Sequence, residues 1–173
     1  MVKIMARRLL GLISDTHDNL KAVDQALKIF KDYNVKLILH AGDWVAPFTL
    51  KRLAQAGIKI IGVFGNNDGE KRLLLEFAKK FNVDLNTEIA TININDKNIA
   101  LIHGTSSIIV EALARSNMFD VVVYGHTHKK ELRRIGKTLL INPGEACGYL
   151  SGEATVAILD VETIDVKFLT LNV

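Results

Sequence analysis

The chain has 173 residues, of which 49% are hydrophobic and 24% are charged, and its formal net charge is +3. This length and balance are typical of one globular domain, so we expect a single domain over residues 1–173 and exclude disorder and low complexity. The mild positive charge does not by itself indicate a nucleic-acid-binding protein.

The single cysteine, Cys147, excludes an internal disulfide framework and indicates a reducing compartment. Basic residues at the start, Arg7 and Arg8 among them, precede the apolar run Leu9–Ile13. That run is shorter than the roughly 7–15 residues of a signal-peptide core, and no apolar run approaches the ~20 residues that span a bilayer. We therefore expect a cytoplasmic protein with no membrane partner.

The first half of the chain alternates short apolar runs with amphipathic stretches, which is the pattern of an α/β sheet domain. The apolar runs predict strands at Leu9–Ser14, Val35–Ala41 and Ile58–Phe64. A helix is expected after each strand, because apolar residues recur there at helical spacing. Asn19 is suited to cap the first helix, and Pro47 stands in the first turn of the second, which we expect to end near Gly57.

The second half begins with a predicted hairpin and ends without helices. Ile89–Asn95 and Asn98–His103 flank Asp96 and Lys97, a polar pair that suits a hairpin turn. A helix over about 106–117 leads to a strand at 120–124, and the remaining strand-like segments are Glu131–Ile135, Thr138–Ile141, Ala154–Asp160 and Ile164–Leu171. Two sheets packed face to face, with helices outside, accommodate both halves.

Five of the predicted strands end in a small residue or directly in a potential metal ligand. These polar residues are, in chain order, Asp15, His17, Asp43, Asn66, His103, His126 and His128. In open α/β sheets, ligands bind beyond the carboxyl ends of the strands, so we expect these side chains to meet at one edge of the sheet. The two pairs spaced two residues apart, Asp15 with His17 and His126 with His128, each share one face of an extended segment.

The seven residues offer oxygen and nitrogen ligands and no thiolate, which suits Mn, Fe, Co, Ni or Zn. Seven ligands are too many for one tetrahedral ion and about right for two divalent ions that share a carboxylate. Asp43, which stands alone after its strand, is the candidate for that shared ligand. Two divalent ions carry more positive charge than Asp15 and Asp43 neutralise, so the site attracts anions. Two-metal sites also activate water for attack on phosphorus. The expected chemistry is hydrolysis of phosphate esters.

The residues at these strand ends resemble a known family. Asp15-Thr16-His17, Gly42-Asp43, Gly65-Asn66-Asn67-Asp68, His103-Gly104 and Gly125-His126-Thr127-His128 resemble, in the same order, the five motifs of the calcineurin-like metallophosphoesterases. The short length and the turn Asn142-Pro143-Gly144 look like the small phosphodiesterase branch of that family. The resemblance implies a four-layer α-β-β-α sandwich of two packed mixed sheets, and a phosphodiesterase with two divalent ions per chain. Mn²⁺ is the expected metal, with Ni²⁺, Fe²⁺, Co²⁺ and Zn²⁺ as alternatives.

The resemblance also implies which ligand serves which ion. It assigns Asp15, His17 and His128 to the first metal and Asn66, His103 and His126 to the second, with Asp43 between them. We expect Asn67, Asp68 and His103 to take part in catalysis.

Asn67 departs from the family pattern, whose commonest motif has a histidine there that contacts the phosphate and assists the leaving group. A carboxamide offers only a neutral hydrogen bond in its place. Asp68 orients a neighbour in the site or, equally, caps the helix that begins near Glu70.

Other residues have plainer interpretations. His40 is expected to pack, or to support a ligand, rather than to bind metal. The loop that contains Cys147 approaches the site, although a lone cysteine is usually inert. A basic cluster follows the last motif and is expected to be a solvated face, with steering of anionic substrates as the alternative. Its members are Lys129, Lys130, Arg133 and Arg134.

The leading functional hypothesis is a phosphodiesterase that uses a metal-activated hydroxide. The alternatives are a phosphomonoesterase and a non-catalytic protein-binding scaffold of the same fold, such as the retromer subunit that resembles this family. The complete ligand set favours the enzyme. The expected partner is a phosphate-ester substrate, with nucleic acid only as a substrate, and small relatives suggest a homodimer.

Overall fold

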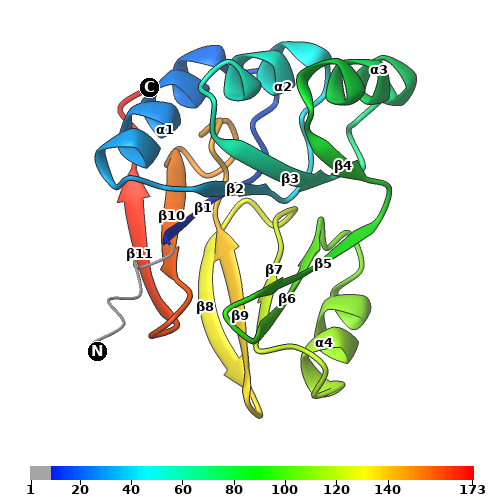
Figure 1. Cartoon of the computed structure of the whole chain (residues 1–173), viewed down its shortest axis with the longest axis vertical. Helices are drawn as coiled ribbons and strands as arrows, with labels where there is room; N and C mark the ends of the chain where they lie inside the picture. Colours follow the sequence, from blue (N-terminus) through cyan, green and yellow to red (C-terminus); the bar gives the residue numbers. More distant parts are fainter. Residues whose placement is uncertain (1–8) are drawn as a thin grey trace, which may run out of the picture.

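The computed structural model describes residues 9–173, so the basic residues near the start, Arg7 and Arg8 among them, lie outside the described residues. The described chain forms two mixed sheets. The six-stranded sheet has the order β11-β10-β1-β2-β3-β4, and the five-stranded sheet has the order β5-β6-β7-β9-β8. Helices α1, α2 and α3 cover the outer face of the first sheet, and α4 lies outside the second (Figure 1). The expected four-layer α/β sandwich is confirmed.

The strands of the six-stranded sheet are β1 (Leu9–Ile13), β2 (Leu37–His40), β3 (Lys59–Val63), β4 (Asp84–Asn86), β10 (Thr155–Asp160) and β11 (Asp165–Thr170). The strands of the five-stranded sheet are β5 (Ile89–Ile94), β6 (Lys97–Ile102), β7 (Val121–Val123), β8 (Lys130–Ile135) and β9 (Thr138–Pro143). The helices are α1 (Leu20–Asp32), α2 (Pro47–Ala54), α3 (Lys71–Phe81) and α4 (Ser107–Arg115). No helix in the described part of the chain is both long and apolar enough to cross a bilayer.

The alternation of side chains along the strands divides the core into layers. In β2, Leu37 and Leu39 point between the two sheets, where they join a cluster that includes Ile99 and Val121 of the second sheet. Ile38 points the other way, into the layer between the first sheet and helices α1–α3. A third, smaller cluster packs α4 against the outer face of the second sheet. The central strands of both sheets, such as β2 and β7, are therefore buried on both faces, which explains why their sequences are almost entirely apolar.

The residues predicted to begin the first two helices, and to mark the end of the second, do so in the structure. The Asn19 side chain accepts a hydrogen bond from the backbone N–H of Ala22 at the start of α1. Pro47 opens α2, and Gly57 adopts a left-handed backbone (φ 72°) shortly after that helix ends. The predicted position of the hairpin turn was wrong by one residue, because the turn residues are Asn95 and Asp96 rather than Asp96 and Lys97. Both turn residues have positive φ, as a two-residue type I′ turn requires.

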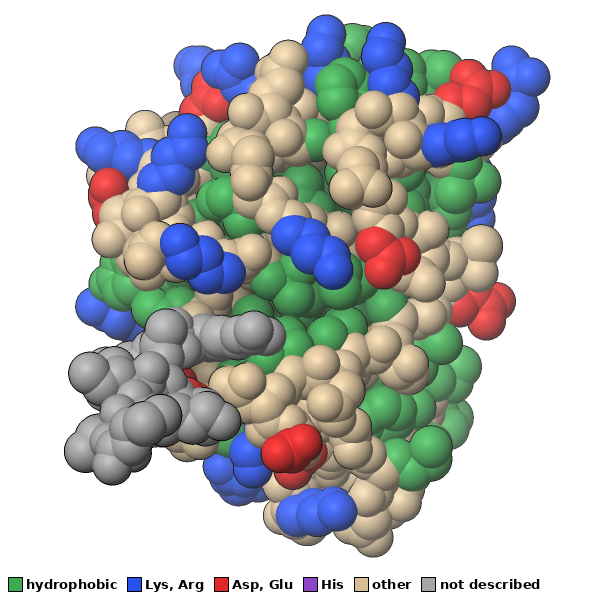
Figure 2. Space-filling model, in the orientation of Figure 1, with side chains coloured by type: hydrophobic (Ala, Val, Ile, Leu, Met, Phe, Trp, Pro, Cys, Tyr) green, Lys and Arg blue, Asp and Glu red, His purple; other side chains and the backbone are tan. Residues whose placement is uncertain are grey.

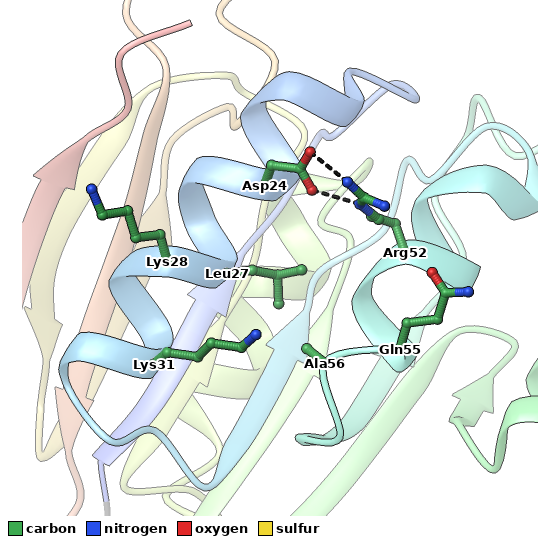
Figure 3. Close-up of a pocket in the computed structure, with 7 residues that line it drawn as sticks. All are labelled: Asp24, Leu27, Lys28, Lys31, Arg52, Gln55 and Ala56. Atoms are coloured by element: carbon green, nitrogen blue, oxygen red, sulfur yellow. Dashed lines mark hydrogen bonds and ion pairs between the residues drawn. The ribbon is translucent and has the colours of Figure 1, made fainter.

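An ion pair joins the first two helices on the outside of the molecule. Both carboxylate oxygens of Asp24 on α1 accept hydrogen bonds from Arg52 on α2, at 2.6 and 2.8 Å. The pair spans a shallow groove that Leu27 and Ala56 line (Figure 3). Figure 2 shows lysine and arginine side chains gathered over the layer of helices α1–α3. Hydrophobic side chains gather at the lower right of the molecule in the same view, where Figure 1 places α4.

Candidate metal centre

The candidate ligands lie at the carboxyl ends of five strands, three from the first sheet and two from the second. Asp15 and His17 follow β1, Asp43 follows β2 and Asn66 follows β3. The loops after β1 and β2 are joined by backbone bonds from the N–H of Asp15 to the Gly42 carbonyl and from the N–H of His17 to the Asp43 carbonyl, both 3.1 Å. This geometry places the ligands of the first sheet side by side.

The ligands of the second sheet face them across the interface between the sheets. His103 follows β6, and His126 and His128 follow β7. The His103 ring nitrogen Nδ1 lies 2.7 Å from the carbonyl oxygen of Ala41, and the backbone N–H of His126 donates to Oδ2 of Asp15 at 3.1 Å. The site therefore spans both sheets.

Four of the candidate ligands form one compact group. One ligand atom from each of Asp15, His17, Asp43 and His128 lies within 4.8 Å of the others. Within the group, Oδ1 of Asp15 is 3.4 Å from Nε2 of His128, and Oδ2 of Asp43 is 3.5 Å from Nε2 of His17. These separations are those of atoms that share one small cation, which each would contact at about 2 Å.

The other three candidate ligands form a second group around one amide oxygen. Oδ1 of Asn66 lies 2.9 Å from Nε2 of His103 and 2.8 Å from Nδ1 of His126. Oδ2 of Asp43 lies 3.5 Å from Nε2 of His103, the same distance that separates it from His17 in the first group. One oxygen of Asp43 therefore faces both groups.

Hydrogen bonds fix which ring nitrogen two of the histidines present to the site. Nδ1 of His103 is within bonding distance of a carbonyl oxygen, which can only accept, so this nitrogen carries the proton. Nδ1 of His128 lies 2.7 Å from Oε2 of Glu145 and donates to it in the same way. With Nδ1 bonded in this way, Nε2 is the nitrogen that each ring turns toward Asp43 or Asp15, and it is the nitrogen available to a metal ion.

Unpartnered buried atoms give an independent test of whether these residues fit a cation. In the described part of the chain, the buried side-chain nitrogen and oxygen atoms without a hydrogen-bond partner are Oδ1 of Asp15, Nε2 of His17 and Oγ1 of Thr49. Two of the three belong to the first ligand group. Because an unpaired buried polar atom costs about 1–3 kcal/mol, a divalent ion at this position would satisfy atoms that otherwise destabilise the fold, and these residues therefore fit a cation.

The two aspartates have different electrostatic environments. Burial raises the pKa of Asp15, and the hydrogen bond from Ser14 and the nearby imidazoles only partly offset that effect. Burial acts in the same direction on Asp43, but hydrogen bonds from His103 and Asn67 outweigh it and hold the pKa of Asp43 well below its usual range. Asp43 is therefore ionised at neutral pH, which suits a ligand shared by two cations.

The backbone around the ligands is strained. Asp15, His17, Asp43, His126 and His128 all have positive φ, between 41° and 65°. Such conformations are uncommon for residues other than glycine, and they cluster where a fold positions functional groups. The backbone at Gly65 also passes very close to Asp43. Any side chain at position 65 would overlap the Asp43 carboxylate, so this position requires glycine.

Asn67 and Asp68 lie at the site, and both side chains are committed to other groups of the protein. The Asn67 backbone N–H and side-chain amide donate to the two oxygens of Asp43, each at 2.8 Å. The buried carboxylate of Asp68 accepts the backbone N–H groups of Val45 and Gly65, both at 2.6 Å. Asp68 therefore joins the loops after β2 and β3, and the capping alternative is wrong because Glu70 occupies the N-cap position of α3.

His40 is packed, as expected. Its ring is fully buried, stacks on Trp44 at 3.4 Å between centroids, and lies 3.0 Å from Oγ1 of Thr16. Burial holds the pKa of His40 well below its usual range, so the ring is neutral. The ring also accepts the backbone N–H of Gly42, and His40 thus supports the loop that carries Asp43 without facing the ligand groups.

Glu145 is the residue of this site that the sequence analysis missed. It is fully buried in the loop after β9 and contacts His128 directly. The same loop brings Sγ of Cys147 within 4.8 Å of ring nitrogens of His17 and His128, so the expected approach of this loop is confirmed. The thiol donates to Glu145, and burial raises the pKa of Cys147 to about 12, which keeps it protonated and a poor ligand at neutral pH.

Two members of the basic cluster are neutralised by neighbouring carboxylates. Lys130 pairs with Glu153 at 2.6 Å, and Arg133 pairs with Glu131 at 2.6 Å and with Glu111 at 3.5 Å. Paired surface charges contribute little to a long-range field. This pairing favours the solvated-face interpretation over substrate steering.

Comparison with known proteins identifies the class of protein that this fold and site define. The sequence profile of the calcineurin-like phosphoesterase superfamily domain matches residues 9–164. The chain belongs to this superfamily, and the resemblance seen in the motifs is confirmed.

Individual members of the superfamily are similar to this chain over nearly its whole length. A phosphodiesterase of Methanocaldococcus jannaschii is 38% identical over 164 residues, which cover 94% of this chain and 99% of the relative. The solved structure of a novel archaeal phosphodiesterase superposes with a TM-score of 0.89 at 38% identity, covering 94% of this chain and 99% of the other. Vps29 of Chaetomium thermophilum superposes with a TM-score of 0.68 at 17% identity, covering 95% and 97%, and shares the fold.

Proposed function

We propose that this protein is a metal-dependent phosphodiesterase whose two divalent ions are held by the seven candidate ligands, with Asp43 shared between them. The observation that carries the proposal is the position of one oxygen of Asp43, 3.5 Å from Nε2 of both His17 and His103. Mn²⁺ is the metal that we propose, because the donors are imidazoles, carboxylates and one amide oxygen. The similarity to proteins named phosphodiesterases supports diesters as the substrate class.

When bound, a pair of divalent ions lowers the pKa of water enough to supply a nucleophile at neutral pH and offsets charge on the phosphate. The side chains of the protein position the metal ligands and the loops that carry them. His103 and His128 would bind the ions through Nε2, because their Nδ1 atoms are held by hydrogen bonds to the Ala41 carbonyl and Glu145. We assign Asn67 the role of orienting Asp43, and Asp68 the role of holding together the two loops that carry the ligands.

The net reaction consumes one water and one diester. The water oxygen forms a new bond to phosphorus, the bond from phosphorus to one ester oxygen breaks, and a proton passes to the departing alkoxide. The products are a phosphate monoester and an alcohol. We propose that the whole chain acts as one domain, in the reducing cytoplasm that its single cysteine indicates.

The test combines metal content with hydrolysis of bis-p-nitrophenyl phosphate. Chelation should abolish hydrolysis, and Mn²⁺ should restore it better than Ca²⁺, which prefers all-oxygen ligand sets. Asp43→Asn should lose both bound ions and activity, whereas Asp24→Asn, which changes an exposed carboxylate on α1, should change neither. Full activity in metal-stripped protein would refute the proposal.

The same assay separates the alternatives. Hydrolysis of p-nitrophenyl phosphate in preference to the diester would identify a monoesterase. Stoichiometric metal binding without hydrolysis of either ester would identify a non-catalytic scaffold.

A further inference from the structure

A cavity of about 350 Å³ opens directly beside the second ligand group. Asn66 and His103 form part of its wall, so the cavity and the candidate metal centre share two residues. The rest of the wall comes from the ends of β3 and β6 and the loops after them, the connection between β4 and β5, the first residue of α3, and one face of α4. A group bonded to a phosphate at the ligand cluster is therefore within reach of this cavity.

The walls of the cavity are largely apolar. They include Phe64, Ile89, Ile102, Ile109 and Leu113. Ile109 and Leu113 are four residues apart and share one face of α4. Ile109 is 50% exposed and Ile89 is 38% exposed, although both are large hydrophobic side chains. Apolar side chains left open to solvent beside a polar site are typical of surfaces that bind a ligand.

The charged side chains of the wall balance one another. Apart from the metal-ligand His103, the wall carries one cation, Lys71, and one anion, Glu88. The Lys71 ammonium lies 5.6 Å from the centroid of the Phe64 ring, in cation–π contact. A cavity with no net charge does not select for a second phosphate group, and it favours a neutral organic substituent.

We propose that this cavity binds the organic substituent of the phosphate diester and selects a flat, neutral apolar group over a small alkyl group. The inference rests on the proposed phosphodiesterase activity. A volume of about 350 Å³ is at the lower end of the ~300–1,000 Å³ of small-molecule sites. The cavity therefore accommodates a single ring system, such as an aryl group or a nucleobase, rather than an oligomer.

The test uses two diesters that share a leaving group and differ only in the other substituent. Methyl p-nitrophenyl phosphate and phenyl p-nitrophenyl phosphate both release p-nitrophenolate, and their uncatalysed rates correct for intrinsic reactivity. We expect kcat/KM to be at least about 10-fold higher for the phenyl ester, since even one methylene in an apolar pocket is worth about 10–200-fold. Equal corrected values for the two esters, together with equal affinities for the two phosphonates described below, would overturn the proposal, because the phosphonates lack the p-nitrophenyl ring that both esters share.

Two variants assign the preference to this cavity. Ile109→Ser and Ile89→Ser each remove an apolar side chain from the wall of the cavity without changing a candidate ligand. Each should therefore lower kcat/KM for the phenyl ester more than for the methyl ester and so reduce the preference between them. Ile108→Ser is the matched control, because Ile108 is the neighbouring residue of α4, is 79% exposed and does not line this cavity. A phenyl preference that survives in both test variants would overturn the assignment.

A binding measurement keeps the inference separate from the proposed activity. Phenylphosphonate should bind the Mn²⁺-loaded protein at least about 10-fold more tightly than methylphosphonate, by the same apolar gain. The Ile109→Ser variant should bind the two phosphonates more equally. If neither ester is hydrolysed but this difference in affinity is found, the proposed function fails while the cavity assignment stands. Equal affinities in the native protein refute the cavity assignment alone.

Discussion

Glu145 shows how a residue outside the motifs controls one inside them. Its carboxylate accepts hydrogen bonds from Nδ1 of His128, the hydroxyl and backbone N–H of Ser151, and the thiol of Cys147. Burial alone would raise the pKa of Glu145, but the donors on Ser151 and His128 outweigh it and lower the pKa to about 2. The group is therefore an anion at neutral pH, and it keeps the proton of His128 on Nδ1 and the lone pair on Nε2.

We predict that Glu145→Gln weakens metal binding. The substitution preserves the size of the side chain but replaces a charged acceptor of the His128 proton with a neutral amide. Loss of such a supporting partner typically costs about 10–100-fold in metal affinity. Competition with a chromogenic chelator measures the effect, and Glu153→Gln is the control, because Glu153 lies nearby, is exposed and pairs with Lys130. Identical affinities in the two variants would contradict the role of Glu145.

Asn67 supports a prediction about leaving groups. Its side-chain amide already donates to Asp43, and a carboxamide cannot supply a proton to a departing alkoxide. General acid catalysis typically contributes about 10²–10⁴-fold and matters most for strongly basic leaving groups. We therefore expect the rate to fall steeply across a series of diesters as the leaving-group pKa rises. The slope is measured on the native protein and on Asn67→His, and a flat series for the native protein would show that another group supplies the proton.

The residue scale also shows where sequence reasoning stops. Asp15, His17 and the other candidate ligands were identifiable because each follows an apolar strand, and parallel strands deliver such residues to one edge. Glu145 had no such signal, because its function depends on a loop that returns to the site from more than a hundred residues beyond Asp15. The roles of Asn67 and Asp68 were equally hidden, since both depend on contacts with the loop after β2.

At the scale of elements, two loops depend on one buried carboxylate. Asp68 accepts the backbone N–H groups of Gly65 in its own loop and of Val45 in the loop after β2. Val45 is a β-branched residue with φ 76°, a conformation that must be imposed by its surroundings. The hydrogen bond to Asp68 helps to impose it.

We predict that Asp68→Asn destabilises the fold and reduces metal-dependent hydrolysis together. The amide keeps one acceptor oxygen and turns its NH₂ group toward a backbone N–H, which leaves a buried donor unpaired at a cost of about 1–3 kcal/mol. Thermal unfolding and bound-metal content of the same samples measure the two effects. Glu70→Gln, two residues along and exposed, should change neither; a native melting temperature in Asp68→Asn would show that the two hydrogen bonds contribute nothing.

The order of the elements was largely predictable, and the exceptions have physical causes. The central strands contain uninterrupted apolar runs because both of their faces are buried, and the helices repeat apolar residues at their own period. β4 was missed because Asp84–Asn86 is short, lies at the edge of the sheet and contains a single apolar residue. The hairpin turn was displaced by one residue because Asn95, Asp96 and Lys97 are all polar, and backbone φ distinguishes the turn.

For the whole molecule, the candidate metal centre exists only where the two sheets meet. Asp15, Asp43 and Asn66 come from the first sheet, and His103, His126 and His128 come from the second. The apolar cluster that joins the sheets, with Leu39 on one side and Val121 on the other, is therefore also what brings the ligands together. In the unfolded chain the outermost ligands, Asp15 and His128, are 113 positions apart, so a metal ion bound by both would favour the folded state.

We therefore predict that metal binding raises the melting temperature of the whole chain in a single transition. A site occupied at 100 times its dissociation constant adds about 2.7 kcal/mol of stability. For a chain of this size that gain corresponds to a rise of roughly 5–10 °C per ion. Differential scanning calorimetry with Mn²⁺ and with EDTA measures the difference, and Asp43→Asn should show almost none, because it loses the ligand shared by both groups. Separate transitions for the two sheets, or an equal rise in Asp43→Asn, would mean that the ions do not bind across the sheet interface.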